Sequence, residues 1–396
     1  MVQILTIFST LIFSRIFTIE EFGELAFYVS YGSLIVAFGG MRFDYLILKE
    51  NINEKYIGYM LSNLISLVVN ILIVLIAIFI NIKFEILKNI NFYYMFLFGV
   101  GFCFFNNFVQ YLVSEKKYDY FIKLRLIQVV IVFIVVIIFY YIFNFEDSMI
   151  YAYSLSQLFL GVICLFLVLD KSKISKLNNF YKFFKSFFRE SLKNSIISFL
   201  QYGSPLVPVL IGGYFFDQKN IGAYFVFSQM ISAPLNIFRR NILIFFNGEF
   251  SNKDKFNVFI KSEIFKIKNL IIFTIMILML SIIMMFFQKE IVYLALGQQW
   301  VSYSYLLLPL IIYFVFDCLL QPFTTLLPLW GKVNYSLSIE AFRFIFLISI
   351  LPLLIIYFNL NFIQFLIGYI FIMLFFYLII FFKVIFLGKN KGFRYI

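Results

Sequence analysis

Several charged side chains stand within or at the ends of long apolar stretches of the sequence, and five of them are candidates for a function: Arg15, Arg42, Arg239, Arg240 and Asp317. Ionised groups are costly in an apolar environment, so each marks either a functional site or a side chain that reaches a polar boundary. Guanidinium groups bind phosphates through paired hydrogen bonds. The residue types therefore suit anion recognition by arginine and the binding of a proton or cation by one acid.

The four arginines are interpreted differently. Arg42 and Arg240 stand in two stretches that resemble each other, and two interpretations remain open for both: anion binding beside a central cleft, or a side chain that extends to the lipid headgroups. Arg239 is interpreted as a determinant of membrane topology. Arg15 lies on the side where basic residues are scarce, which favours a functional role.

Asp317 interrupts the apolar stretch LLLPLIIYFVFDCLLQPF. A carboxylate there must be protonated or paired, because a lone charge in hydrocarbon is strongly destabilising. We favour a proton or cation site over a purely structural hydrogen bond to a neighbouring helix. Glu340 and Arg343 are three residues apart and are interpreted as a local ion pair near the surface.

Several catalytic chemistries are excluded by composition. The sequence contains no histidine, and its three cysteines, Cys103, Cys164 and Cys318, lie in apolar stretches without a CxxC spacing. Ser–His and Cys–His catalysis and histidine-ligated metals are therefore excluded. No phosphate-binding loop, glycosidase carboxylate pair or metal cluster is recognisable, so we expect no catalytic residue, no metal and no cofactor.

The composition is that of a multi-pass membrane protein. Of the 396 residues, 63% are hydrophobic and only 13% are charged, which a soluble domain could not bury. Apolar runs of membrane-spanning length recur along the chain, and they are continuous rather than alternating, which favours helices over a β-barrel. The net charge of +12 comes from basic residues between these runs, so it indicates topology and not nucleic-acid binding.

Reading the apolar runs between charged breaks predicts twelve spans. Most of the 32 Lys and Arg residues follow even-numbered spans or lie in the C-terminal tail, which places both termini in the cytoplasm. The first span is short, and its beginning has neither the basic region nor the cleavage site of a signal peptide. The predicted spans are 1–17, 22–41, 56–81, 92–113, 120–144, 148–169, 191–216, 221–246, 267–288, 302–327, 334–358 and 361–387.

Weak internal similarity divides these spans into two six-helix lobes. Residues 14–30 align with 213–229, and Lys117, Asp119 and Tyr120 align with Lys332, Asn334 and Tyr335. Both similarities fall at equivalent places, which predicts parallel, pseudo-symmetric repeats. The expected parts are lobe 1–169, linker 170–190 and lobe 191–396 with its basic tail. The linker is interpreted as an amphipathic helix on the cytoplasmic membrane surface rather than a solvated connection.

All seven prolines fall in the second half of the chain. Pro205 and Pro208 lie in the glycine-containing stretch GSPLVPVLIGG, and Pro234 interrupts the next span. Proline removes a backbone hydrogen bond and bends helices. These three positions are therefore predicted to bend their helices, and hinge motion and a static kink both remain open.

Three stretches carry a resemblance to a known family. They are SRIFTIEEFGELAFYVSY followed by MRFDYLIL, the hairpin FFDQKNIGAYFVFSQMISAPLNIFRR, and LALGQQWVSYSYLLLPL with its G-x-x-W pattern. The chain resembles bacterial O-antigen flippases of the Wzx type, within the multidrug/oligosaccharidyl-lipid/polysaccharide (MOP) exporter superfamily. Ile19 replaces the usual proline of the T-P-E turn, and the first span is shortened.

The resemblance implies a MATE-like fold and an inner-membrane flippase for an undecaprenyl-pyrophosphate-linked glycan. In relatives, arginines of spans 1, 2 and 8 line a cationic cavity, and the matching positions are Arg15, Arg42 and Arg240. Implied partners are this substrate, membrane lipids, coupling protons or sodium, and a polysaccharide polymerase or chain-length protein. Rival functions are an ion-coupled multidrug antiporter of the same fold, an O-antigen polymerase or ligase, and a structural membrane subunit.

Overall fold

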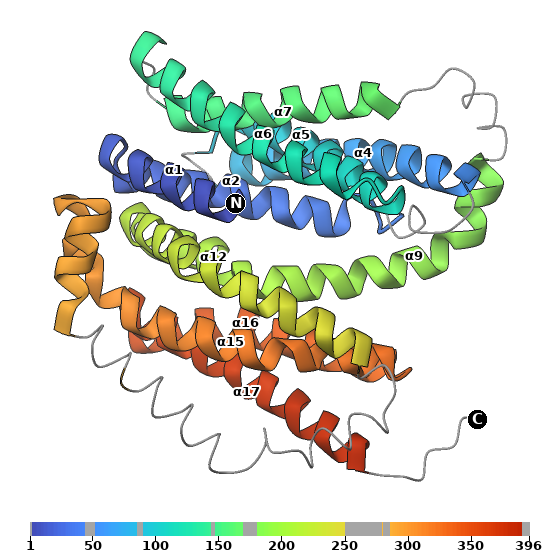
Figure 1. Cartoon of the computed structure of the whole chain (residues 1–396). Helices are drawn as coiled ribbons and strands as arrows, with labels where there is room; N and C mark the ends of the chain where they lie inside the picture. The colour runs from blue at the N-terminus through green and yellow to red at the C-terminus, as the bar shows by residue number, and fades with distance from the viewer. Residues whose placement is uncertain are drawn as a thin grey trace. The chain divides into compact units, whose positions relative to one another are not determined.

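The computed structural model describes residues 2–43, 52–84, 90–143, 147–168, 180–249, 279 and 286–389. Every regular element in these residues is helical (Figure 1), as the apolar pattern predicts. The helices of the first half of the chain are α1 (Val2–Ile16), α2 (Ile19–Phe38), α4 (Ile52–Phe84), α5 (Phe92–Ser114), α6 (Tyr118–Ile138) with a short π-helix (Phe139–Phe143), and α7 (Ser148–Val168).

The helices of the second half of the chain begin with α9 (Phe180–Gly203), whose first residues belong to the predicted linker. Residues 286–296 are also helical. The remaining elements are a 3₁₀ turn (Ser204–Leu206), α10 (Val207–Leu210), α11 (Gly212–Phe215), α12 (Gln218–Glu249), a 3₁₀ segment (Gln298–Leu306), α15 (Leu307–Leu329), α16 (Val333–Phe358) and α17 (Phe362–Lys389).

Eight of the described helical segments are long and apolar enough to cross a membrane. They coincide with predicted spans 3–7 and 10–12. Predicted spans 1, 2 and 8 are present as helices α1, α2 and α12. Predicted span 9 lies outside the described residues, apart from residue 279 and its last three residues.

Packing divides the chain into two compact units. Unit 1 contains residues 1–9 and 20–222, and unit 2 contains residues 10–19 and 223–396. The last part of α1 therefore packs with the second half of the chain, and α9–α11 pack with the first. The lobe boundaries inferred from the sequence repeat remain a prediction.

Unit 1 is built around α5, which packs closely against α7 and α4. A Cβ atom on Gly101 of α5 would overlap the backbone of Gln157 on α7, and one on Gly161 would overlap the backbone of Gly101. Two glycines thus allow the backbones to touch, as at the small-residue interfaces of membrane helices. Around this contact lie aromatic side chains such as Phe105 and Tyr59, both fully buried.

The turns related by the sequence repeat contact each other within unit 1. The amino group of Lys219 lies 3.0 Å from the carboxylate of Glu20. A Cβ atom on Gly23 would overlap the carbonyl oxygen of Gln218. Gly23, near the start of α2, is therefore needed for close packing against the start of α12.

In unit 2, α15, α16 and α17 lie side by side (Figure 1). The core between them contains Phe323, Leu326, Trp330 and Ile380, all buried. The outer faces carry exposed apolar side chains such as Phe371. Exposed apolar surface of this extent is expected where helices face lipid.

Candidate functional site

The most unusual feature of unit 2 is a cluster of charged and phenolic side chains between its helices. We define the charged cluster as Arg239 of α12, Asp317 of α15, Glu340 and Arg343 of α16, and Tyr377 of α17. Four helices thus each supply polar groups to an otherwise apolar interior. Because the two cations balance the two anions, the cluster is electrically neutral when all four groups are ionised.

Asp317 is the centre of the charged cluster. Its Oδ2 accepts a hydrogen bond from Nη1 of Arg239 at 3.0 Å, and its Oδ1 accepts one from the hydroxyl of Tyr377 at 2.8 Å. Both carboxylate oxygens are therefore engaged. This agrees with one of the two expectations for this acid, which was to be either protonated or paired, since charge-assisted bonds offset part of the desolvation cost.

The sequence-based interpretation of Arg239 missed this contact. A mid-span acid requires a cationic or hydrogen-bonding partner, and that requirement was the available signal. Sequence alone could not select Arg239 from the other arginines, because the choice depends on how α12 packs against α15. Tyr377 was missed for the same reason.

Glu340 and Arg343 form the expected ion pair, but not near the surface. Their side chains are only 2% and 3% exposed. The guanidinium carbon of Arg343 also lies 5.3 Å from the ring centroid of Tyr377, a cation–π distance. The pair is buried because α16 packs against α15 and α17, and the ring of Tyr377 on α17 covers Arg343.

A pair of tyrosines extends the polar interior beside the cluster. The hydroxyls of Tyr313 on α15 and Tyr369 on α17 are 3.2 Å apart. Both side chains are buried. Hydroxyls can donate or accept, so this pair tolerates changes of charge nearby better than an apolar contact would.

Arg15, predicted to bind an anion, lies at the end of α1. Its Nη2 donates to the carbonyl oxygen of Leu294 at 2.8 Å, and the side chain is exposed. The same end of α1 is held by the G-x-x-W stretch. Gln299 donates to the carbonyl oxygens of Ser14 at 2.7 Å and Phe17 at 3.1 Å.

Arg42 follows α2 in a backbone conformation that is rare for residues other than glycine. Met41 and Arg42 have φ angles of 45° and 54°, which cost roughly 1–2 kcal/mol each. The hydroxyl of Ser191 on α9 donates to the carbonyl oxygen of Met41, and Phe43 stacks on Phe184 with ring centroids 5.6 Å apart. The turn that carries Arg42 is thus tightly fixed to α9.

Arg240 lies in α12, and its side chain is outside the described residues. By unit, Arg42 belongs to unit 1, whereas Arg15 and Arg240 belong to unit 2. Asp317 belongs to unit 2 as well, and the contact it makes is with Arg239.

The prolines predicted to bend helices occupy two different settings. α9 ends at Gly203, and Pro205 lies in the 3₁₀ turn that separates it from α10, which contains Pro208. This stretch is divided into short helical pieces. Pro234, in contrast, lies inside α12, which continues as one helix.

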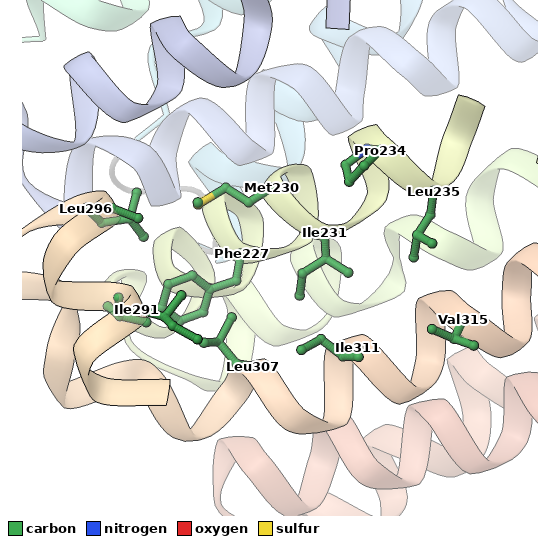
Figure 2. A pocket seen from close by; sticks show the side chains of 12 residues that line it. Phe227, Met230, Ile231, Pro234, Leu235, Ile291, Leu296, Leu307, Ile311 and Val315 are labelled. Atoms are coloured by element: carbon green, nitrogen blue, oxygen red, sulfur yellow. The ribbon is translucent and has the colours of Figure 1, made fainter. Parts of the chain in front are cut away.

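An apolar cavity of about 300 Å³ lies in unit 2 between α12, residues 291–296 and α15 (Figure 2). Its lining includes Met230, Leu235, Ile311 and Val315, and none of its lining side chains is polar. Such a cavity suits hydrocarbon and cannot hold a sugar or a pyrophosphate.

A second polar cluster lies in unit 1. Arg125 of α6 donates to Asn106 at 2.9 Å and to Gln128 at 3.2 Å, and Gln128 donates to Gln157 of α7 at 3.0 Å. Arg125 and Gln128 thus link α6 to α5 and α7 through amide groups.

Comparison with known proteins assigns the family. Residues 12–305 match the model of the polysaccharide biosynthesis protein family. The chain belongs to this family. No curated protein sequence matches it.

Solved structures show that this member of the polysaccharide biosynthesis protein family has a MATE-like fold. An inward-facing multidrug resistance MATE transporter of the MOP superfamily aligns with a TM-score of 0.60 at 14% identity, covering 98% of this chain and 96% of that one. The eukaryotic MATE transporter AtDTX14 aligns with a TM-score of 0.58 at 13% identity, covering 98% and 91%. Identities this low show the fold alone.

Proposed function

We propose that the protein moves a polyprenyl-pyrophosphate-linked oligosaccharide across the cytoplasmic membrane for O-antigen, capsule or another surface polysaccharide. The match of residues 12–305 to the polysaccharide biosynthesis family carries this proposal. The MATE-like fold supports it, because that fold occurs in transporters of the MOP superfamily. In this proposal, twelve spans form two pseudo-symmetric lobes that expose a site alternately to each side, with both termini in the cytoplasm.

The proposed ligands of the pyrophosphate are Arg15, Arg42 and Arg240. A diphosphate leaving water needs bidentate cationic partners. The conformation at Arg42 supports its role, since rare backbone angles held by surrounding contacts cluster at functional sites. We assign coupling to protons or sodium to Asp317, and bending of the transport helices to Pro205, Pro208 and Pro234.

A multidrug antiporter is the main rival on the same fold. Such transporters bind cationic drugs and rely on membrane-embedded acids, often in the first span. The described residues of α1, VQILTIFSTLIFSRI, contain arginine and no acid. This charge pattern favours an anionic substrate.

The test is replacement of Arg42 and Arg240 together by alanine in cells that depend on this protein for surface glycan. We expect surface glycan to disappear while the amount of protein in the membrane stays normal. Lys219→Ala, which removes a cation from an exposed ion pair, is the matched control and should leave the glycan intact. Normal surface glycan in the double variant would contradict the assigned headgroup site, and increased drug tolerance without glycan production would favour the antiporter.

A further inference from the structure

The ion pair between Arg239 and Asp317 is unevenly covered. The side chain of Asp317 is 8% exposed, whereas that of Arg239 is 30% exposed. The carboxylate is therefore enclosed, whereas part of the Arg239 side chain is accessible. A guanidinium has five N–H donors, and the pair with Asp317 uses Nη1.

An anion that approaches Arg239 competes with Asp317 for the same positive charge. If Arg239 turned to the anion, Asp317 would remain buried with Tyr377 as its hydrogen-bond donor. A hydroxyl does not neutralise a carboxylate, and breaking a buried pair is strongly destabilising when one charge remains uncompensated. Uptake of one proton by Asp317 from water removes that cost.

We propose that Arg239 is a further ligand for the pyrophosphate of the lipid-linked substrate, and that it exchanges between Asp317 and this anion. This inference rests on the proposed function. Each exchange brings one proton onto Asp317, so charge balances: the cation passes from the carboxylate to the diphosphate, and the carboxylate becomes neutral. Anion binding and proton binding are thereby coupled, and each strengthens the other by the same factor.

The surroundings of Asp317 fit this coupling. Besides Arg239 and Tyr377, the titratable or charged groups that act on it from α12, α15, α16 and α17 are phenols, one thiol and one arginine: Tyr224, Tyr313, Cys318, Arg343 and Tyr369. Arg343 is already paired with Glu340. Within the described residues, Arg239 is the cation that bonds directly to Asp317, so its departure changes the charge balance at this acid.

The position of Arg239 on α12 also fits a lipid-linked anion. Leu235, one helical turn earlier, lines the apolar cavity, and Cys318, next to Asp317, contacts the carbonyl oxygen of Leu235 at 3.7 Å. The cationic Arg239 thus lies one helical turn beyond the apolar cavity on α12. A prenyl diphosphate needs this arrangement, because its hydrocarbon chain requires apolar surroundings and its terminal diphosphate requires a cation.

The test measures binding of farnesyl diphosphate to the purified full-length protein by calorimetry, with inorganic pyrophosphate as a second probe. Asp317→Asn keeps the shape but removes the competing charge, and it should bind farnesyl diphosphate about tenfold more tightly or better, within the range typical of coupled sites. Wild-type binding should strengthen as pH falls, because protonation of Asp317 releases Arg239. The Asn variant should lose that part of the pH dependence.

Titrations in buffers with different ionisation enthalpies count the protons taken up. The difference between wild type and Asp317→Asn removes the contribution of the ligand's own protonation. We expect about one additional proton in wild type, as one carboxylate is neutralised. Tighter binding of farnesyl diphosphate than of pyrophosphate identifies the lipid-linked source, while equal binding would assign the site to a free phosphate and overturn the proposal as stated.

A second variant guards against misfolding. Arg239→Gln combined with Asp317→Asn removes both charges together, which buried pairs tolerate better than loss of one. It should remain folded, bind farnesyl diphosphate at least about tenfold more weakly than Asp317→Asn, and show no proton uptake beyond the ligand's own. Glu20→Gln, in the exposed pair of unit 1, is the control and should match wild type.

Two further outcomes overturn the inference. One is unchanged affinity and proton uptake in Asp317→Asn, and the other is a double variant that binds farnesyl diphosphate as tightly as Asp317→Asn. Either result leaves the proposed function standing if surface glycan still depends on Arg42 and Arg240. Loss of that dependence would contradict the headgroup assignment independently of what happens at Arg239.

Discussion

Trp300 donates its indole N–H to the carbonyl oxygen of Ser14 at 2.9 Å. The same carbonyl also accepts from Gln299. The last carbonyls of a helix have no partner within it, and here the G-x-x-W stretch supplies partners from 282 to 286 residues further along the chain. Gly297 makes the turn with a φ angle of 103°, which favours glycine.

Trp300→Phe should therefore destabilise unit 2. It keeps most of the buried ring but removes the donor to Ser14, and the loss of this bond costs about 0.5–1.5 kcal/mol because the carbonyl still accepts from Gln299. We expect a lower melting temperature of the detergent-solubilised protein. Ser302→Ala is the matched control, because the hydrogen bond of Ser302 is local, to the carbonyl oxygen of Gln299 at 3.5 Å. Equal melting of both variants would show that the indole bond does not hold α1.

The contact of α5 with α7 gives a second prediction. Gly101→Ala places a methyl group against the backbone of Gln157, where neither helix can yield without moving as a whole. Overpacking costs roughly 1–3 kcal/mol, so we expect less monodisperse protein and a lower melting temperature. Gly213→Ala, whose new Cβ would meet nothing within 4 Å, controls for helix propensity. Equal melting temperatures for the two variants would show that the close packing of α5 against α7 does not require glycine at position 101.

Sequence reasoning captured the helical class and most spans because a long uncharged apolar run can satisfy its backbone only as a helix. It also showed that Asp317 must be protonated or paired, because the cost of a lone buried charge does not depend on the fold. The family resemblance is confirmed by the match to the polysaccharide biosynthesis family and by the MATE-like fold.

The choice of partners could not be predicted from the sequence. Whether Asp317 meets Arg239 or another arginine depends on the rotation of α12 relative to α15, and no periodicity specifies that rotation. The burial of Arg343 likewise depends on Tyr377 of α17, which lies further along the chain. The Gly101 contact and the Trp300 bond to Ser14 are long-range in the same way.

The pair of Glu340 and Arg343 gives the last prediction. Both side chains are almost fully buried, so Arg343→Met alone leaves an uncompensated carboxylate, which costs about 3–5 kcal/mol. We expect that variant to be poorly expressed or aggregated. Glu340→Gln combined with Arg343→Met removes both charges and should recover most of the stability, because a buried pair adds little over apolar packing of similar volume.

The stability of the double variant shows whether Arg343 serves mainly to neutralise Glu340 or stabilises unit 2 through other contacts. Size-exclusion profiles and melting temperatures of the two single variants and the double variant form a double-mutant cycle. A double variant that is as unstable as Arg343→Met would show that Arg343 stabilises unit 2 mainly through other contacts, with the ring of Tyr377 at 5.3 Å as the leading one. Arg343→Lys would then also fail, since an ammonium stacks less well on the ring and cannot reproduce the planar guanidinium.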